Sequence, residues 1–139
     1  MDKIVLDTNS LIASLSKRGK YYNVWKGLQD GDYILCVTTE IIHEYEEILE
    51  RKTNALVANH VIQFLINSNF VEQHEPFYSF NLIAQDPDDN KFVDCAIEAN
   101  AKFIVSNDAH FDILKEIPFP QVNVITLQAY SDYLKHTTK

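Results

Sequence analysis

The sequence predicts an α/β protein: a three-layer α/β/α sandwich around a central, mainly parallel twisted sheet of about five strands. Two observations carry this prediction. Short apolar runs alternate with segments of helical period, as in chains built from βαβ units. The chain has 139 residues with 46% hydrophobic content, which suits one domain over residues 1–139 with a core of its own.

The first third of the chain shows this alternation clearly. Lys3–Leu6 is an apolar run that predicts a buried strand, and a helix over Ser10–Lys17 follows it at once. Tyr21–Leu28 carries a second helical pattern, and the turn residues Asp30-Gly31-Asp32 close it. The second strand is predicted over Tyr33–Val37.

The middle of the chain contributes two helices and a short strand. Thr38 or Thr39 can cap a helix that runs to about Arg51, and a further helix spans Ala55–Ile66. Phe70–Gln73 is a candidate strand. The residues after it have no clear period, and we interpret 75–85 as a loop.

The last third begins with Pro87, a residue favoured in the first turn of a helix, which opens a helix through about Asn100. The remaining elements are predicted by short apolar runs and by the prolines between them. They are a strand over Phe103–Val105, a short helix near Phe111–Lys115, a strand over Val122–Ile125 and a helix over Leu127–Leu134.

Composition restricts the function classes. The net charge of −8 argues against a module that holds nucleic acid by its overall field, but not against an enzyme whose acids bind metal ions. Cys36 and Cys95 have no metal-type spacing and are expected to be buried free thiols in a reducing cytoplasm. No apolar stretch approaches the ~20 residues of a membrane span, and no secretory signal is visible, so we expect a cytoplasmic protein.

Two acids follow strands that a parallel sheet would bring to one edge. Asp7 ends the first strand, and Asp108 lies just beyond Phe103–Val105. In open α/β sheets the ligand crevice lies beyond the carboxyl ends of the strands. We therefore expect both carboxylates on the crevice side of the sheet.

Helical periodicity selects two more acids. Glu44 and Glu46 lie on the two shoulders of their helix's apolar stripe, and the place of Glu44 nearer the helix start favours it. The other acids of this helix, Glu40, Glu47 and Glu50, point to solvent. Asp89 falls on the apolar stripe of the Pro87–Asn100 helix, where a lone carboxylate would be costly to bury without a partner or a metal.

Asp94, on the same helix, projects about 160° from the stripe and is expected to be solvated.

Asp7, Glu44, Asp89 and Asp108 together would repel one another unless cations neutralise them. Hard oxygen ligands suit Mg²⁺ or Mn²⁺ rather than zinc, and these ions support phosphoryl transfer. The sequence therefore predicts a magnesium or manganese site.

The segments IVLDTNSLIASL, TTEIIHEYEEIL and DPDDNKFVDCAIEANAKFIVSND resemble the PIN domain, a compact metal-dependent nuclease fold. The resemblance covers essentially the whole chain and looks closest to the branch described as toxin components of toxin–antitoxin pairs. In the fourth motif, Ser106-Asn107-Asp108 stands where Thr-Gly-Asp is frequent, and the carboxylate is retained. The family's four acids fall on Asp7, Glu44, Asp89 and Asp108, with Asn9 and Ser106 at the small polar positions beside them.

The resemblance implies a Mg²⁺- or Mn²⁺-dependent endoribonuclease that acts as the toxin of such a pair. The expected partners are an RNA substrate, a small antitoxin protein and a second copy of the chain in a homodimer, with no membrane. Whether Asp94 or Asp112 joins the metal site stays open. The candidate substrate contacts are Lys17, Arg18, Lys20 and His110.

Two alternatives compete with the nuclease. One is a catalytically silent binding module on the same fold. The other is a phosphatase or receiver-type α/β domain, which would want a phosphoacceptor Asp at a central strand end. ILCVTTE offers no Asp after the second strand, which disfavours that reading.

Overall fold

A computed structural model describes residues 1–76, 78–83 and 87–137, apart from the side chain of Pro87. The described strands form one parallel sheet in the order β3-β2-β1-β4-β5. Their bounds are β1 (Lys3–Leu6), β2 (Ile34–Val37), β3 (Val71–Gln73), β4 (Phe103–Val105) and β5 (Val124–Ile125). The predicted parallel sheet is thus confirmed.

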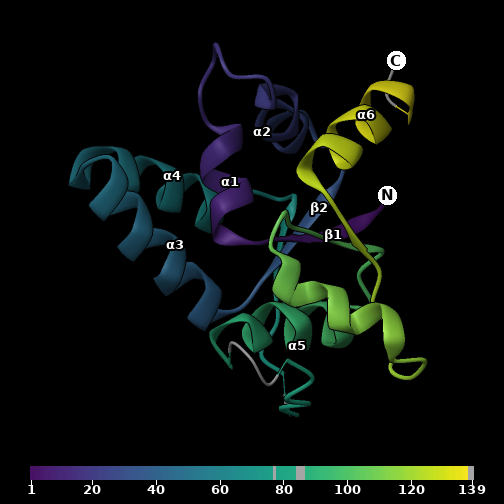
Figure 1. Cartoon of the computed structure of the whole chain (residues 1–139). Coiled ribbons are helices and arrows are strands. Elements are labelled where there is room, and N and C mark those ends of the chain that lie inside the picture. The colour runs from purple at the N-terminus through teal and green to yellow at the C-terminus, as the bar shows by residue number, and fades with distance from the viewer. Residues whose placement is uncertain (77, 84–86, 138–139) are drawn as a thin grey trace.

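Helices cover both faces of this sheet (Figure 1). In the view of Figure 1, α1, α2 and α6 lie above the strands and α5 lies below them, while the α3–α4 hairpin flanks the sheet on the left. The α-helices are α1 (Thr8–Ser14), α2 (Tyr22–Asp30), α3 (Thr39–Lys52), α4 (Ala55–Asn67), α5 (Asn90–Ala99) and α6 (Leu127–Thr137). The 3₁₀ segments are η1 (Pro87–Asp89) and η2 (Ala109–Glu116). The three-layer α/β/α prediction is therefore also confirmed.

The strand order places the switch point at the centre of the sheet. The chain moves outward from β1 through β2 to β3 and then returns to pair β4 with the other side of β1. Leu6 of β1 is in register with Val105 of β4, so the residues that follow these strands, Asp7 and Ser106, lie side by side. The Asp7 N–H donates to the Val105 carbonyl at 3.2 Å, which continues the ladder by one residue.

Some predicted boundaries were wrong. The first helix begins at Thr8 rather than Ser10, because the Asp7 side chain caps it by accepting from the Ser10 N–H at 2.8 Å. It ends at Ser14 rather than Lys17. The last strand covers only Val124–Ile125, although Val122 is buried beside it.

The helix predicted from Pro87 to Asn100 is a 3₁₀ turn followed by α5, and the short helix near Phe111–Lys115 is the longer 3₁₀ segment η2. Thr38, rather than Thr39, caps α3, accepting from the Ile41 N–H at 3.1 Å. The predicted loop over 75–85 contains neither helix nor strand at its described residues, while residues 77, 84 and 85 lie outside them.

Cys36 and Cys95 are buried free thiols, as expected. Within the described residues, each helix is too short or too polar to cross a membrane.

Candidate metal centre

Asp7 is the most buried of the four predicted acids, with 7% of its surface exposed. One carboxylate oxygen accepts from the Ser10 N–H, and the other accepts from the Ser106 hydroxyl. Burial raises the pKa of Asp7; the bonds from Ser10 and Ser106 oppose that rise, and the charge of Asp108 adds to it. The folded protein therefore holds this negative charge in a place that disfavours it.

The start of α3 brings Glu44 to the same edge. Tyr45, fully buried, donates its hydroxyl to the Leu6 carbonyl at 2.6 Å and so fixes α3 against the end of β1. The neighbouring Glu44 then meets α1, where the Thr8 hydroxyl donates to Glu44 Oε2. On its other side, Glu44 Oε1 lies 2.7 Å from the Lys91 ammonium.

Asp89 and Asp108 approach each other at the start of α5 and η2. His110 Nδ1 lies 3.5 Å from Asp89 Oδ2 and 3.2 Å from Asp108 Oδ1. The ligand atoms of these three residues all lie within 4.8 Å of one another, close enough for one ion to bind them together. Sequence reasoning considered His110 only as a substrate contact; its place between two acids is what the structure adds.

The two supporting polar residues have distinct partners. Ser106 donates to Asp7 and accepts from the Asp108 N–H at 2.9 Å, so a single hydroxyl links two of the acids. Asn9 is exposed, and its amide oxygen accepts from the Lys52 ammonium at 3.2 Å. Lys52 at this edge is a second feature that the sequence did not indicate.

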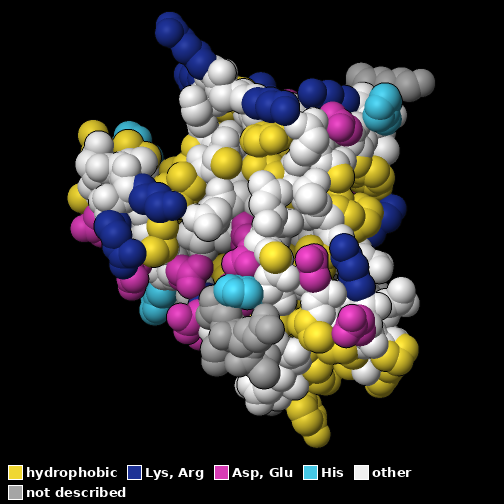
Figure 2. Space-filling model, viewed as in Figure 1, with side chains coloured by type: hydrophobic (Ala, Val, Ile, Leu, Met, Phe, Trp, Pro, Cys, Tyr) yellow, Lys and Arg dark blue, Asp and Glu magenta, His cyan; other side chains and the backbone are white. Residues whose placement is uncertain are grey.

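A cavity of ≈ 340 Å³ opens beside these acids. Figure 2 shows acidic side chains gathered near the centre of this face with a histidine beside them, while Lys and Arg side chains lie mainly toward its rim. The cavity is lined by Asp7, Asn9, Ser10, Ala13, Tyr21, Asn107, Asp108 and Leu127. Solvent and a polar ligand therefore have access to Asp7 and Asp108.

The sequence leaves open whether two further acids, Asp94 and Asp112, join the metal site. Asp94 is half-buried rather than solvated, because the loop after β3 folds over it and the Phe80 N–H donates to its carboxylate at 3.1 Å. That burial raises the pKa of Asp94. Asp112 is exposed and lies 3.7 Å from Lys115. Neither acid belongs to the group formed by Asp89, Asp108 and His110.

The predicted basic cluster lies at the other end of α1 from Asp7. Lys17, Arg18 and Lys20 are exposed in the turn between α1 and α2. Since α1 has 7 residues, it separates this turn from Asp7 by about 10 Å. Figure 1 shows the α1–α2 connection extending away from the sheet.

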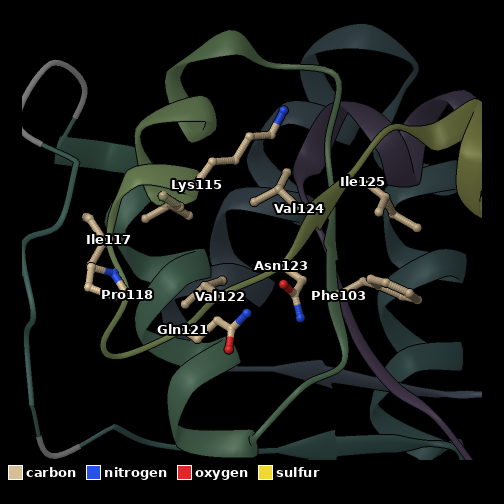
Figure 3. Close-up of a pocket in the computed structure, with 10 residues that line it drawn as sticks. Phe103, Lys115, Ile117, Pro118, Gln121, Val122, Asn123, Val124 and Ile125 are labelled. Atoms are coloured by element: carbon tan, nitrogen blue, oxygen red, sulfur yellow. The ribbon is translucent and has the colours of Figure 1, made fainter.

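A larger hollow, of ≈ 600 Å³, runs along β5 on another part of the surface (Figure 3). Its ten lining residues are mostly apolar, and Lys115 is the one charged side chain among them. Its lining residues include neither a carboxylate nor an imidazole.

Comparison with known proteins shows the family of this chain. A family model described as PIN domain matches residues 3–110. The chain belongs to the PIN domain family. No curated protein matches it in sequence.

Solved structures share the PIN fold. A chain of VapBC2 from Rickettsia felis, bound to a DNA fragment from its promoter, superposes with a TM-score of 0.61 at 17% identity, covering 89% of this chain and 98% of that one. A chain of DNA-bound VapBC from Salmonella typhimurium gives a TM-score of 0.62 at 15% identity, covering 91% and 99%.

The donor set of this PIN domain fits a hard divalent cation. Four carboxylates supply oxygen donors, which suit Mg²⁺ and Mn²⁺. Burial, above all, raises the pKa of Asp7, and its two oxygens accept from the neutral donors Ser10 and Ser106. A divalent ion at this edge would supply positive charge to this buried carboxylate.

Proposed function

We propose that this protein is a Mg²⁺- or Mn²⁺-dependent endoribonuclease that hydrolyses RNA phosphodiesters, and that it is the toxin of a toxin–antitoxin pair. The observation that carries the enzymatic part is that Asp7 and Asp108 line one open cavity at the carboxyl edge of the sheet. Asp89 lies beside Asp108, and Glu44 accepts from Thr8, the residue after Asp7. Carboxylates gathered in this way supply the oxygen donors that a hard divalent cation prefers.

Asp7, Asp89 and Asp108 are the proposed direct ligands, and Glu44 completes the outer coordination, directly or through water. When bound, the ion supplies positive charge to the phosphate and lowers the pKa of a water molecule that acts as the nucleophile. Ser106 orients the Asp7 carboxylate by its hydrogen bond. Lys52 and His110, both at this edge, are positioned to meet substrate phosphates.

Two acids on one helical segment test this proposal. Asp89→Asn should abolish cleavage of mixed RNAs in Mg²⁺ or Mn²⁺, a loss of at least ~100-fold, because it removes a proposed ligand. Asp94→Asn is the matched control: its amide oxygen can still accept from the Phe80 N–H, so most activity should remain. Cleavage is measured on gels, and reactions that contain EDTA give the background level of cleavage.

Equal loss in both variants would mean that the choice of Asp89 over Asp94 is wrong, or that the site includes both acids. Cleavage that persists in EDTA would rule out the metal. A wild type that binds Mn²⁺ but cuts no RNA would favour the silent binding module.

The toxin assignment rests on the family and on a surface suited to a partner. An apolar groove of ≈ 450 Å³ lies between α2 and α4, and the chain's charge of −8 favours a basic partner. The groove's apolar lining is Leu15, Trp25, Val57, Val61 and Phe64. We propose that an apolar helix of a small basic antitoxin covers it. Co-expression with the product of a neighbouring small open reading frame, with the mass of the complex measured, identifies that antitoxin and also reports whether the chain forms a homodimer.

A further inference from the structure

Lys91 is the feature of the acidic edge that the proposed reaction does not yet use. Its side chain is 8% exposed, whereas Lys3, Lys26, Lys102 and Lys115 are between 38% and 67% exposed. Lysine is rarely buried without a partner. Here the ammonium lies 2.7 Å from Glu44 Oε1 and donates to the Asp88 carbonyl at 2.6 Å. Lys91 is therefore held inside the edge rather than exposed on its rim.

Both carboxylate oxygens of Glu44 have a partner in the protein. Glu44 Oε1 faces the ammonium, and Glu44 Oε2 accepts from the Thr8 hydroxyl. Asp7 differs, because its two oxygens accept from neutral donors, Ser10 and Ser106. A protein cation thus already lies against Glu44, whereas among the described residues no ion pair is found at Asp7.

The Lys91 ammonium limits where a divalent ion can bind at this edge. Glu44 already has a cation 2.7 Å from its Oε1, whereas Asp7 and Asp108 line the open cavity. A second divalent ion beside Glu44 would lie next to the Lys91 ammonium and be repelled by it.

We propose that Lys91 replaces a second metal ion: it neutralises Glu44, so that the edge binds one divalent ion through Asp7, Asp89 and Asp108, and Glu44 acts only through water. Lys91 is thus a positioning residue that sets the number of metal ions. This inference rests on the proposed function, because it presupposes a metal site.

Counting bound Mn²⁺ tests the proposal. Titration calorimetry, together with electron paramagnetic resonance of free Mn²⁺, should give one ion per chain for the wild type and two for Lys91→Met, which keeps the aliphatic stem but removes the charge. Lys91→Met should also have a lower thermal midpoint in EDTA and a larger gain on adding Mn²⁺. Lys102→Met is the matched control, because Lys102 lies over an aromatic ring and near an acid but away from this edge. The Lys102→Met variant should bind one ion.

The double variant Lys91→Met/Glu44→Gln removes both charges and guards against misfolding of the single variant. It should fold and return to one ion. Two ions in the wild type, or one ion in Lys91→Met with an unchanged midpoint, would overturn the role of Lys91 and leave the metal site standing. No Mn²⁺ bound to the wild type would instead overturn the proposed function itself.

Discussion

Two groups of metal-binding side-chain types lie on the described part of this sheet, and they behave in opposite ways. The first is the acidic edge with Asp89, Asp108 and His110. The second, here called the β2–β3 cluster, consists of Cys36, Glu72 and His74, whose ligand atoms also lie within 4.8 Å of one another. By proximity alone, either group could hold an ion.

Their electrostatics separate them. In the β2–β3 cluster, the single carboxylate of Glu72 lies 2.9 Å from His74 and 3.1 Å from Lys3, and these hydrogen bonds lower its pKa. Burial raises the pKa of the Cys36 thiol to about 12, so it stays protonated. At the acidic edge, the pKa of Asp7 is raised instead.

The one carboxylate of the β2–β3 cluster thus has two basic side chains beside it, whereas Asp7 at the acidic edge is buried among neutral donors. A buried carboxylate with neutral neighbours favours a cation more than a carboxylate that already has a basic partner.

The largest expected effect comes from removing Asp7's charge. Mn²⁺ at 100 times its Kd should stabilise the wild type by about 2.7 kcal/mol, and Asp7→Asn should lose that gain. The measurement is the thermal midpoint with Mn²⁺ and with EDTA. His74→Ala, from the β2–β3 cluster, is the control and should keep the full Mn²⁺ gain. If His74→Ala loses the gain and Asp7→Asn keeps it, the two groups have been assigned the wrong way round.

A smaller effect is expected from pH in the absence of metal. The folded-state pKa of Asp7 is raised above 3.8, so between pH 3.8 and that raised pKa Asp7 binds more protons in the folded protein than in the unfolded chain. Asp7 therefore lowers the stability of the fold as pH rises through this range. The pKa of Glu72 is lowered, so Glu72 raises the stability as pH increases from its folded-state pKa toward its ordinary value of 4.5.

Midpoints in EDTA across acid pH should show Asp7→Asn gaining on the wild type as pH rises and Glu72→Gln falling behind it. The second effect should be weak, because the Glu72 side chain is 35% exposed and solvent screens its ion pairs. Parallel curves for the two variants would mean that the groups do not differ in charge balance.

The smallest effect concerns substrate binding. The net charge of −8 repels RNA, so binding depends on local basic residues outside both groups. Lys17→Ala/Arg18→Ala/Lys20→Ala should weaken RNA binding and flatten the plot of log affinity against log salt by about 2 units, as for ~2–3 lost phosphate contacts. The measurement is fluorescence anisotropy at several salt concentrations, with far-UV circular dichroism as the folding control. An unchanged slope would direct attention to Lys52, the basic residue that contacts Asn9.

The sequence by itself determined the order of strands and helices, because apolar periodicity reports how each segment is buried within its own element. It also identified Asp7 and Asp108 as the acids that follow β1 and β4, and Asp89 as the acid on a buried stripe. The prediction for Asp7 and Asp108 needed only the rule that parallel strands end on one edge, and the prediction for Asp89 needed only the helical period.

Only the tertiary structure decided which charges meet. The pairing of Lys91 with Glu44 joins two helices, α3 and α5, and no pattern in either helix names its partner. His110 comes between Asp89 and Asp108 because η2 turns back over the start of α5. Asp94 is half-buried because the loop after β3 covers it, although it lies on the polar side of its own helix. Periodicity describes one element at a time, whereas the charges that meet at this edge depend on how separate elements pack against one another.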